Sequence, residues 1–195
     1  MCIIVYHYGF IRVFSIMNLN NVSKIKRELI FQAIEIWDQV SYDRSKFFTE
    51  MRKNNWSRNT SFYDGSYKTC LWKRSIVVKY AAEPNCREST CEIEREFEQY
   101  TSVPSKLKRY FTRSYIYYNG ILIQDKVLKQ CTCDCNLSEI SREFNNQIWD
   151  YKWNHGHSNK GTVKFFDWVY RRAKPWFLSD KPLAENPKPG EFVGW

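Results

Sequence analysis

Several signature motifs of common enzyme classes are missing from this chain. The sequence contains no Gly-x-x-x-x-Gly-Lys phosphate-binding loop, no Gly-x-Ser-x-Gly nucleophile elbow and no His-Glu-x-x-His zinc-binding helix. It also lacks the paired Cys-x-x-Cys knuckles of the common structural zinc sites. These absences argue against P-loop nucleotide hydrolases, against serine hydrolases of the α/β type and against metalloproteases with that zinc-binding motif.

Long apolar runs and long charged runs are absent as well. No apolar span is long enough to cross a membrane, and the first residues lack the basic start and the small-residue cleavage site of a signal peptide. No run of five or more like charges forms a basic tail. We therefore expect an intracellular, cytoplasmic protein with reduced thiols and no membrane partner.

Aromatic side chains and positive charge are abundant. The 195 residues are 43% hydrophobic and 17% aromatic, which is enough to build the core of one domain with an appendage. The formal net charge is +9. Such a charge balance favours anionic partners, whether nucleotide phosphates, nucleic acid or an acidic protein, and does not choose among them.

Two helices are predicted in the N-terminal part of the chain. Apolar residues recur at spacings of three and four over 25–37, which predicts a helix that is capped at Asn21 or Ser23 and ends near Val40. A second helix is predicted over 42–52. The basic residues of this region are more typical of a solvated face than of a binding patch: Lys24, Lys26, Arg27, Arg44, Lys46, Arg52 and Lys53.

A different pattern begins at Trp56 and is typical of strands. Alternating β-forming residues predict five strands, over 59–63, 67–72, 75–80, 113–118 and 121–127. Asp64-Gly65-Ser66 is the predicted turn between the first two. A glutamate-rich helix is predicted over 88–100, between the third and fourth strands. Asn119-Gly120 joins the last two strands and is a strong signal for a tight hairpin.

Another group of elements is predicted after a cluster of three cysteines, Cys131, Cys133 and Cys135. A helix over 137–149 leads to Asp150, and a turn containing glycines feeds a short hairpin that ends at Asp167. A short helix over 169–173 is predicted to follow, before a tail interrupted by prolines.

The order of these features resembles the protein-kinase-like fold, and most closely the small kinase-like proteins encoded by bacteriophages. Three strands with a glycine turn between the first two, a lysine ending the third strand, a glutamate-bearing helix, two more strands, and then Asp, Asn and Asp occur in that order over 59–168. The resemblance implies an α+β, minimal kinase-like fold. Its N-lobe would be a five-stranded antiparallel sheet with one Glu-bearing helix, its C-lobe would be much reduced, and the N-terminal helices would be additional.

The resemblance also implies roles for individual residues. Lys79 would hold the nucleotide phosphates, and Glu96 would hold Lys79, with Glu92 as its substitute. Asp150 would be the catalytic base, and a magnesium ion would be bound by two oxygen donors, from Asn154 and Asp167. Five further positions would contact ATP: Gly65 and Ser66 over the phosphates, and Gln124, Asp125 and Val127 beside the adenine.

Three departures from the family pattern lead to a second hypothesis. The phosphate-covering turn has a single glycine, and Asp150 stands four residues before Asn154, where the family pattern has five. Only 28 residues follow Asp167, which leaves little room for a substrate-binding lobe. We therefore weigh ATP- and magnesium-dependent phosphoryl transfer, to an unknown acceptor, against a catalytically inactive kinase-like protein that binds an acidic or host protein.

A third hypothesis is a basic, aromatic-rich protein that binds nucleic acid. Aromatic rings that lie beside cationic side chains are suited to binding single-stranded nucleic acid. This hypothesis is not favoured, because no stretch interleaves Arg or Lys with aromatic residues at a regular spacing.

The predicted organisation has four segments. These are an N-terminal extension (1–18), a helical appendage (19–55), a minimal kinase-like domain (56–174) and a Pro-rich tail (175–195). The first sixteen residues are either a poorly ordered extension or a hydrophobic strand that docks elsewhere.

The cysteine cluster is a possible metal site that we do not favour. Cys131, Cys133 and Cys135 could bind a soft metal together with ligands from the set Cys86, Cys91, His155 and His157. Alternate residues on an extended segment point to opposite faces, however, so the three thiols do not converge on one ion. We expect reduced thiols rather than a structural zinc.

Overall fold

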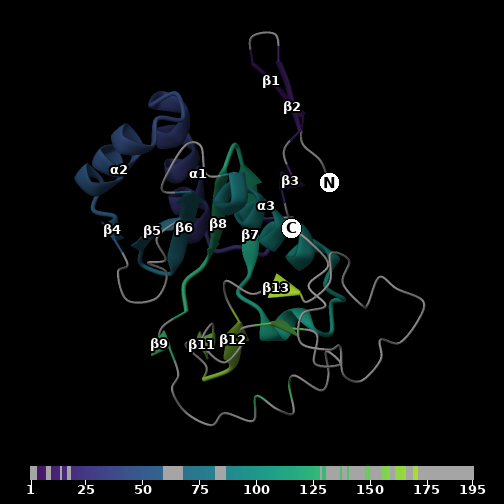
Figure 1. Cartoon of the computed structure of the whole chain (residues 1–195). Coiled ribbons are helices and arrows are strands. Elements are labelled where there is room, and N and C mark those ends of the chain that lie inside the picture. The colour runs from purple at the N-terminus through teal and green to yellow at the C-terminus, as the bar shows by residue number, and fades with distance from the viewer. Residues whose placement is uncertain are drawn as a thin grey trace. The chain divides into compact units, whose positions relative to one another are not determined.

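The chain is divided into two compact units (Figure 1). The computed structural model describes residues 4–7, 10–13, 15–16, 19–58, 68–81, 87–127, 129–130, 137, 140, 148–149, 155–158, 161–165 and 169–170. One unit consists of Met1–Phe97 and Arg113–Lys126, and the other of Glu98–Thr112 and Val127–Trp195.

The first unit is built on an antiparallel sheet with the strand order β3-β7-β8-β6-β5-β4. The strands are β3 (Ser15–Ile16), β4 (Ser57–Arg58), β5 (Lys68–Lys73), β6 (Ile76–Ala81), β7 (Ser114–Tyr118) and β8 (Ile121–Asp125). The prediction of an α+β fold with an antiparallel sheet is confirmed. The strand predicted over 59–63 lies outside the described residues, and β4 immediately precedes it. A separate pair, β1 (Ile4–His7) and β2 (Phe10–Val13), forms an antiparallel hairpin.

Two helices, α1 (Lys24–Gln39) and α2 (Arg44–Lys53), cover one face of this sheet (Figure 1). Ser23 caps α1 by accepting a hydrogen bond from the backbone N–H of Lys26, and Asp43 caps α2 in the same way. The apolar face of the helices and one face of the sheet share a single core. Its largest buried side chains include Trp37, Phe47, Trp56 and Tyr115.

Strand β6 lies at the centre of the sheet and separates two sets of side chains. Successive residues of a strand point to opposite faces. Ile76, Val78 and Tyr80 belong to the core under α1 and α2. Ala81 instead packs with Ile93 and Phe97 of helix α3 (Arg87–Ser102) on the other face. Lys79 alternates with Tyr80, so its side chain lies on the face of the sheet that carries α3.

The β7–β8 hairpin confirms the Asn119-Gly120 signal. Both turn residues have positive φ, 46° at Asn119 and 90° at Gly120, as a type I′ turn requires. Glycine adopts such a φ without steric cost, whereas a residue with a Cβ does not.

We expect Gly120→Ala to destabilise the protein by about 1 kcal/mol or more in urea unfolding, because alanine must adopt this positive φ. A Cβ at this position would contact no atom within 4 Å, so the cost comes from the backbone and not from a clash. Asn119→Gly is the control and should leave the unfolding midpoint nearly unchanged. Equal midpoints for Gly120→Ala and the parent would contradict the assigned turn.

The second unit contains short strands that form two ladders. The strands are β9 (Lys129–Gln130), β10 (Ile148–Trp149), β11 (His155–His157), β12 (Val163–Phe165) and β13 (Val169–Tyr170). Strand β11 pairs with β12 and β9, and β10 pairs with β13, all antiparallel. The 3-10 helix η1 (Lys108–Tyr110) precedes Phe111, whose ring lies 5.9 Å from that of Phe165.

Two helix predictions in this unit are wrong in part. The helix predicted over 137–149 is helical at Leu137 and Ile140, but its last two residues form β10. The helix predicted over 169–173 begins instead with β13. In both places the pairing of remote segments overrides the local helical pattern.

Helices that could serve as membrane spans were also considered. Among the residues described, no helix is both long enough and apolar enough to cross a membrane.

Candidate functional site

The centre of the candidate site is a buried ion pair between Lys79 and Glu96. Lys79 comes from β6 and Glu96 from α3, and the side chains are 0% and 4% exposed. The Lys79 Nζ atom donates to both carboxylate oxygens of Glu96, at 2.9 Å to Oε1 and 2.8 Å to Oε2. Two charges removed from water in this way are costly unless they are paired and hydrogen-bonded. The predicted pairing of these two side chains is therefore present in the structure.

Gln124 extends this pair into a network. Its Nε2 atom donates to Glu96 Oε1 at 2.9 Å and to Ser114 Oγ at 2.8 Å. Gln124 and Ser114 are 1% and 0% exposed and lie opposite each other on β8 and β7. A carboxylate held from two directions has little freedom to turn, so Gln124 fixes the orientation of Glu96 toward Lys79.

One acceptor in this network has no partner among the described residues. The Oε1 atom of Gln124 is buried and makes no hydrogen bond within the described part of the chain. A buried carbonyl oxygen without a donor costs about 1–3 kcal/mol, so a water or a ligand donor at this point would be stabilising.

Asp125, at the end of β8, is also engaged. Its Oδ1 atom accepts hydrogen bonds from Lys26 Nζ at 2.5 Å and from the Tyr115 hydroxyl at 2.7 Å. The backbone N–H of Asp125 donates to the Arg113 carbonyl at 2.8 Å. This residue therefore ties α1 to the end of the strand that was predicted to hold the adenine, and Val127, two residues later, is buried.

In the second unit, the ladders flank the segments that contain the predicted base and magnesium ligands. Trp149 in β10 pairs with Val169 in β13, and His155 in β11 pairs with Phe165 in β12. In the sequence, Trp149 and His155 lie on either side of Asp150 and Asn154, and Phe165 and Val169 lie on either side of Asp167. The structure therefore pairs the residues that flank the predicted base and the predicted magnesium ligands.

Several predicted site residues lie outside the described residues. These are Gly65, Ser66, Asp150, Asn154 and Asp167, together with Cys86, Cys131, Cys133 and Cys135 of the considered metal site. Their assigned roles remain predictions. Within the part of the chain that the structure describes, no three His, Cys, Asp or Glu side chains gather as a metal site would require.

Sequence reasoning missed the network around Glu96. Gln124 was assigned to the adenine-binding segment, yet its side chain points to Glu96, and Ser114 was assigned no role. A signal was available: the alternation along β8 puts Gln124 on the same face as Leu122, which packs beside α3. A polar residue at an inward position of a central strand needs a buried partner.

The chain was also compared with known proteins. No family model matches it, and no curated protein and no solved structure matches it either.

Proposed function

We propose that this chain is a minimal kinase-like protein that binds ATP with magnesium and transfers the γ-phosphoryl group to an acceptor. The observation that carries the proposal is the buried Lys79–Glu96 ion pair. A lysine on the third strand of the meander that pairs with a glutamate of the next helix is an arrangement that protein kinases require for activity. Strands β4, β5 and β6 form this meander, and Lys79 lies on the third of them.

In this proposal Lys79 neutralises the phosphates and Glu96 keeps its ammonium group in place. Phosphoryl transfer needs little covalent chemistry from the protein, since catalysis comes from positioning and charge neutralisation. Gln124 donates to Glu96 and so holds its carboxylate in place, and the Oε1 atom of Gln124 has no hydrogen-bond partner among the described residues. The nucleotide contacts of Gly65, Ser66, Asp125 and Val127 complete the assignment.

Asp150, Asn154 and Asp167 complete the chemistry. Asp150 orients the acceptor hydroxyl, and Asn154 and Asp167 hold the magnesium ion that the nucleotide brings with it. The pairings of Trp149 with Val169 and of His155 with Phe165 support this assignment, because these four residues flank Asp150, Asn154 and Asp167 in the sequence.

A catalytically inactive, ATP-binding or purely protein-binding form is the second candidate. Two observations favour it. The Lys79 ammonium group is 0% exposed and already bound by both oxygens of Glu96, so a phosphate must reach it in an enclosed place. The interval from Asp150 to Asn154 is one residue shorter than in the family pattern. Such a protein would act by binding an acidic or host protein.

We expect ATP with magnesium to raise the melting temperature of the full chain by roughly 5–10 °C at one hundred times its dissociation constant. The double variant Lys79→Met/Glu96→Gln should lose this shift, because it lacks the phosphate-binding ammonium group. In the Asp167→Asn variant, the shift of the melting temperature by ATP should no longer depend on magnesium. The control is Lys24→Met, which removes a lysine that is 84% exposed and should preserve the shift.

Transfer of labelled γ-phosphate separates the two candidates. Label on the chain or on an added acceptor, lost in both site variants, supports the enzyme. A nucleotide-dependent shift without any transfer supports the inactive form. The kinase-like proposal is refuted if ATP changes the melting temperature of neither the parent nor any variant. If oligonucleotides then bind in a strongly salt-dependent way, the nucleic-acid hypothesis replaces it.

A further inference from the structure

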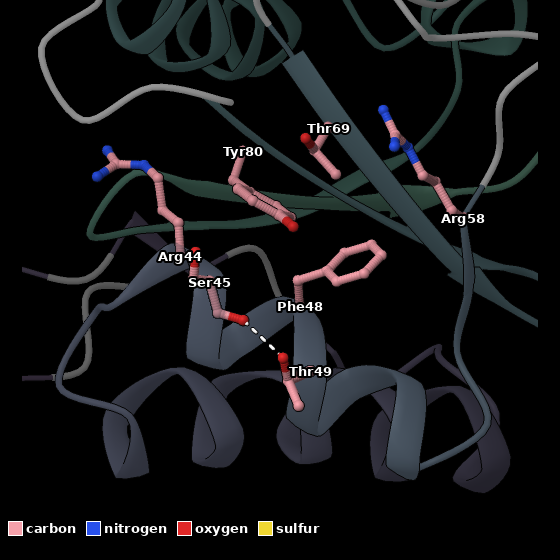
Figure 2. A pocket seen from close by; sticks show the side chains of 7 residues that line it. All are labelled: Arg44, Ser45, Phe48, Thr49, Arg58, Thr69 and Tyr80. Atoms are coloured by element: carbon pink, nitrogen blue, oxygen red, sulfur yellow. Dashed lines mark hydrogen bonds between the residues drawn. The ribbon is translucent and has the colours of Figure 1, made fainter.

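A cavity of about 350 Å³ lies on the side of the sheet opposite to Lys79. Figure 2 shows it between the first turns of α2 and the strands β4, β5 and β6. Tyr80 forms part of its wall, and the neighbouring Lys79 points to the other face, toward Glu96. The cavity is therefore separate from the Lys79–Glu96 pair. A volume of this size matches small-molecule sites.

Two arginines give this cavity a positive charge. Arg44, the first residue of α2, and Arg58, on β4, lie on either side of Tyr80 and Thr69 in Figure 2. None of the seven described residues that line the cavity is a carboxylate. The Nε atom of Arg44 is buried and has no hydrogen-bond partner among the described residues. A buried guanidinium nitrogen without an acceptor is costly, and an anionic ligand would supply the acceptor.

Tyr80 contributes a neutral donor inside this positive field. Burial raises the pKa of its hydroxyl above the ordinary value, while the hydrogen bond with Thr69, and after it the charges of Arg58 and Arg44, act in the opposite direction. The hydroxyl thus stays protonated at neutral pH and can donate a hydrogen bond. Thr69, which lies beside it in Figure 2, carries a second hydroxyl. The guanidinium group of Arg44 points away from this hydroxyl in Figure 2, so Arg44 must change its rotamer to share a ligand with Tyr80.

The remaining wall is partly apolar. Phe48, on the second turn of α2, presents its ring to the cavity in Figure 2. The hydroxyl of Thr49 is already used, since it donates to the Ser45 carbonyl at 3.0 Å. One side of the cavity therefore suits an anion and the other side suits a flat apolar group.

We propose that this cavity binds a small phosphomonoester with an aromatic group. The phosphoryl oxygens accept hydrogen bonds from Arg44, Arg58 and the Tyr80 hydroxyl, and the aromatic group packs on Phe48. Arginine is suited to this task because its planar guanidinium group can bind phosphate with two parallel hydrogen bonds. The inference does not depend on the proposed kinase activity, since neither Lys79 nor Glu96 is among the described residues that line the cavity.

The test is calorimetric titration of the full chain with phenyl phosphate. Phenol, which lacks the phosphoryl group, and inorganic phosphate, which lacks the aromatic group, are titrated for comparison. We expect saturable binding of phenyl phosphate, weaker binding of inorganic phosphate and no binding of phenol. Arg44→Gln and Arg58→Gln should each weaken binding by roughly 10- to 100-fold, since hydrogen bonds to a charged group are lost. Tyr80→Phe removes a donor without changing the net charge and should weaken binding by a smaller factor.

Arg27→Gln is the matched control. Arg27 is exposed on α1 and does not line the cavity, yet its replacement lowers the net charge by the same amount. Unchanged affinity in this control, together with losses in the Arg44 and Arg58 variants, supports the site. An equal loss in all three variants would show general attraction to a basic protein and would overturn it. Absence of saturable binding by the parent, or equal binding of phenol and phenyl phosphate, would overturn it as well.

The Lys79→Met/Glu96→Gln variant distinguishes this site from the nucleotide site. It should bind phenyl phosphate like the parent, because the substitutions lie on the other face of the sheet. If phenyl phosphate binding is lost in this variant while the Arg44 and Arg58 variants bind normally, the phosphate site belongs to Lys79 and the cavity proposal is refuted.

Discussion

Lys79→Met alone should destabilise the protein by about 3–5 kcal/mol, one of the largest effects expected for any single substitution in this chain. The substitution removes the cation that binds both oxygens of Glu96 and leaves a carboxylate that is 4% exposed. The Gln124 amide remains as one donor to it among the described residues. A neutral hydrogen bond does not replace the charge of the ammonium group, so the folded state loses the pairing that offsets the cost of burying the carboxylate.

The double variant Lys79→Met/Glu96→Gln should recover most of this loss. Methionine fills a volume similar to the lysine stem, and a neutral glutamine can still accept the hydrogen bond from Gln124 through its amide oxygen. A buried ion pair replaced as a unit by neutral groups is often close to neutral in stability. Urea unfolding of the parent, both single variants and the double variant gives the coupling free energy between the two positions.

This cycle also separates a structural pair from a functional one. If Lys79 and Glu96 only stabilise the fold, the double variant should match the parent in nucleotide response as well as in stability. We expect it to regain stability and to lack the response to ATP. A double variant as unstable as Lys79→Met would show that the two side chains contribute independently, and would contradict the ion pair observed here.

The Lys79–Glu96 pair illustrates how far the sequence could lead. A lysine inside an apolar strand indicated that its charge needs a partner or a bound anion, and the resemblance to kinase-like proteins pointed to Glu96, which is that partner. Local rules located α1, α2 and the β7–β8 hairpin. For these three elements the signal is contained within one element or one turn.

The features that were missed depend on contacts between remote segments. Strands β10 and β13 have two residues each and exist because Trp149 pairs with Val169, which no local pattern encodes. Arg44 was taken for part of a solvated face, because its spacing along α2 does not reveal that α2 packs against β5 and β6. The cavity with Arg58 appears only once that packing is formed.

The second large effect is expected at Trp37, where Trp37→Ala should cost about 3–5 kcal/mol. The indole is 1% exposed and packs edge-on against Phe47, with ring centroids 4.8 Å apart, and tilted against Tyr80 at 6.4 Å. Its Nε1 atom donates to the Asn119 carbonyl at 3.2 Å, in the turn of the β7–β8 hairpin. Removing the ring leaves a void between α1, α2 and the sheet and deletes this hydrogen bond.

The matched control is Phe31→Ala on the same helix. Phe31 is 48% exposed, so its truncation should change stability by less than about 1 kcal/mol. Hydrogen exchange at the β6 and β8 amides provides a readout remote from the substitution. If α1, α2 and the sheet form one cooperative unit, Trp37→Ala should lower the protection of these amides by the same free energy as it lowers global stability. Unchanged protection in the sheet would mean that the two helices unfold on their own, although they share one buried core with its strands.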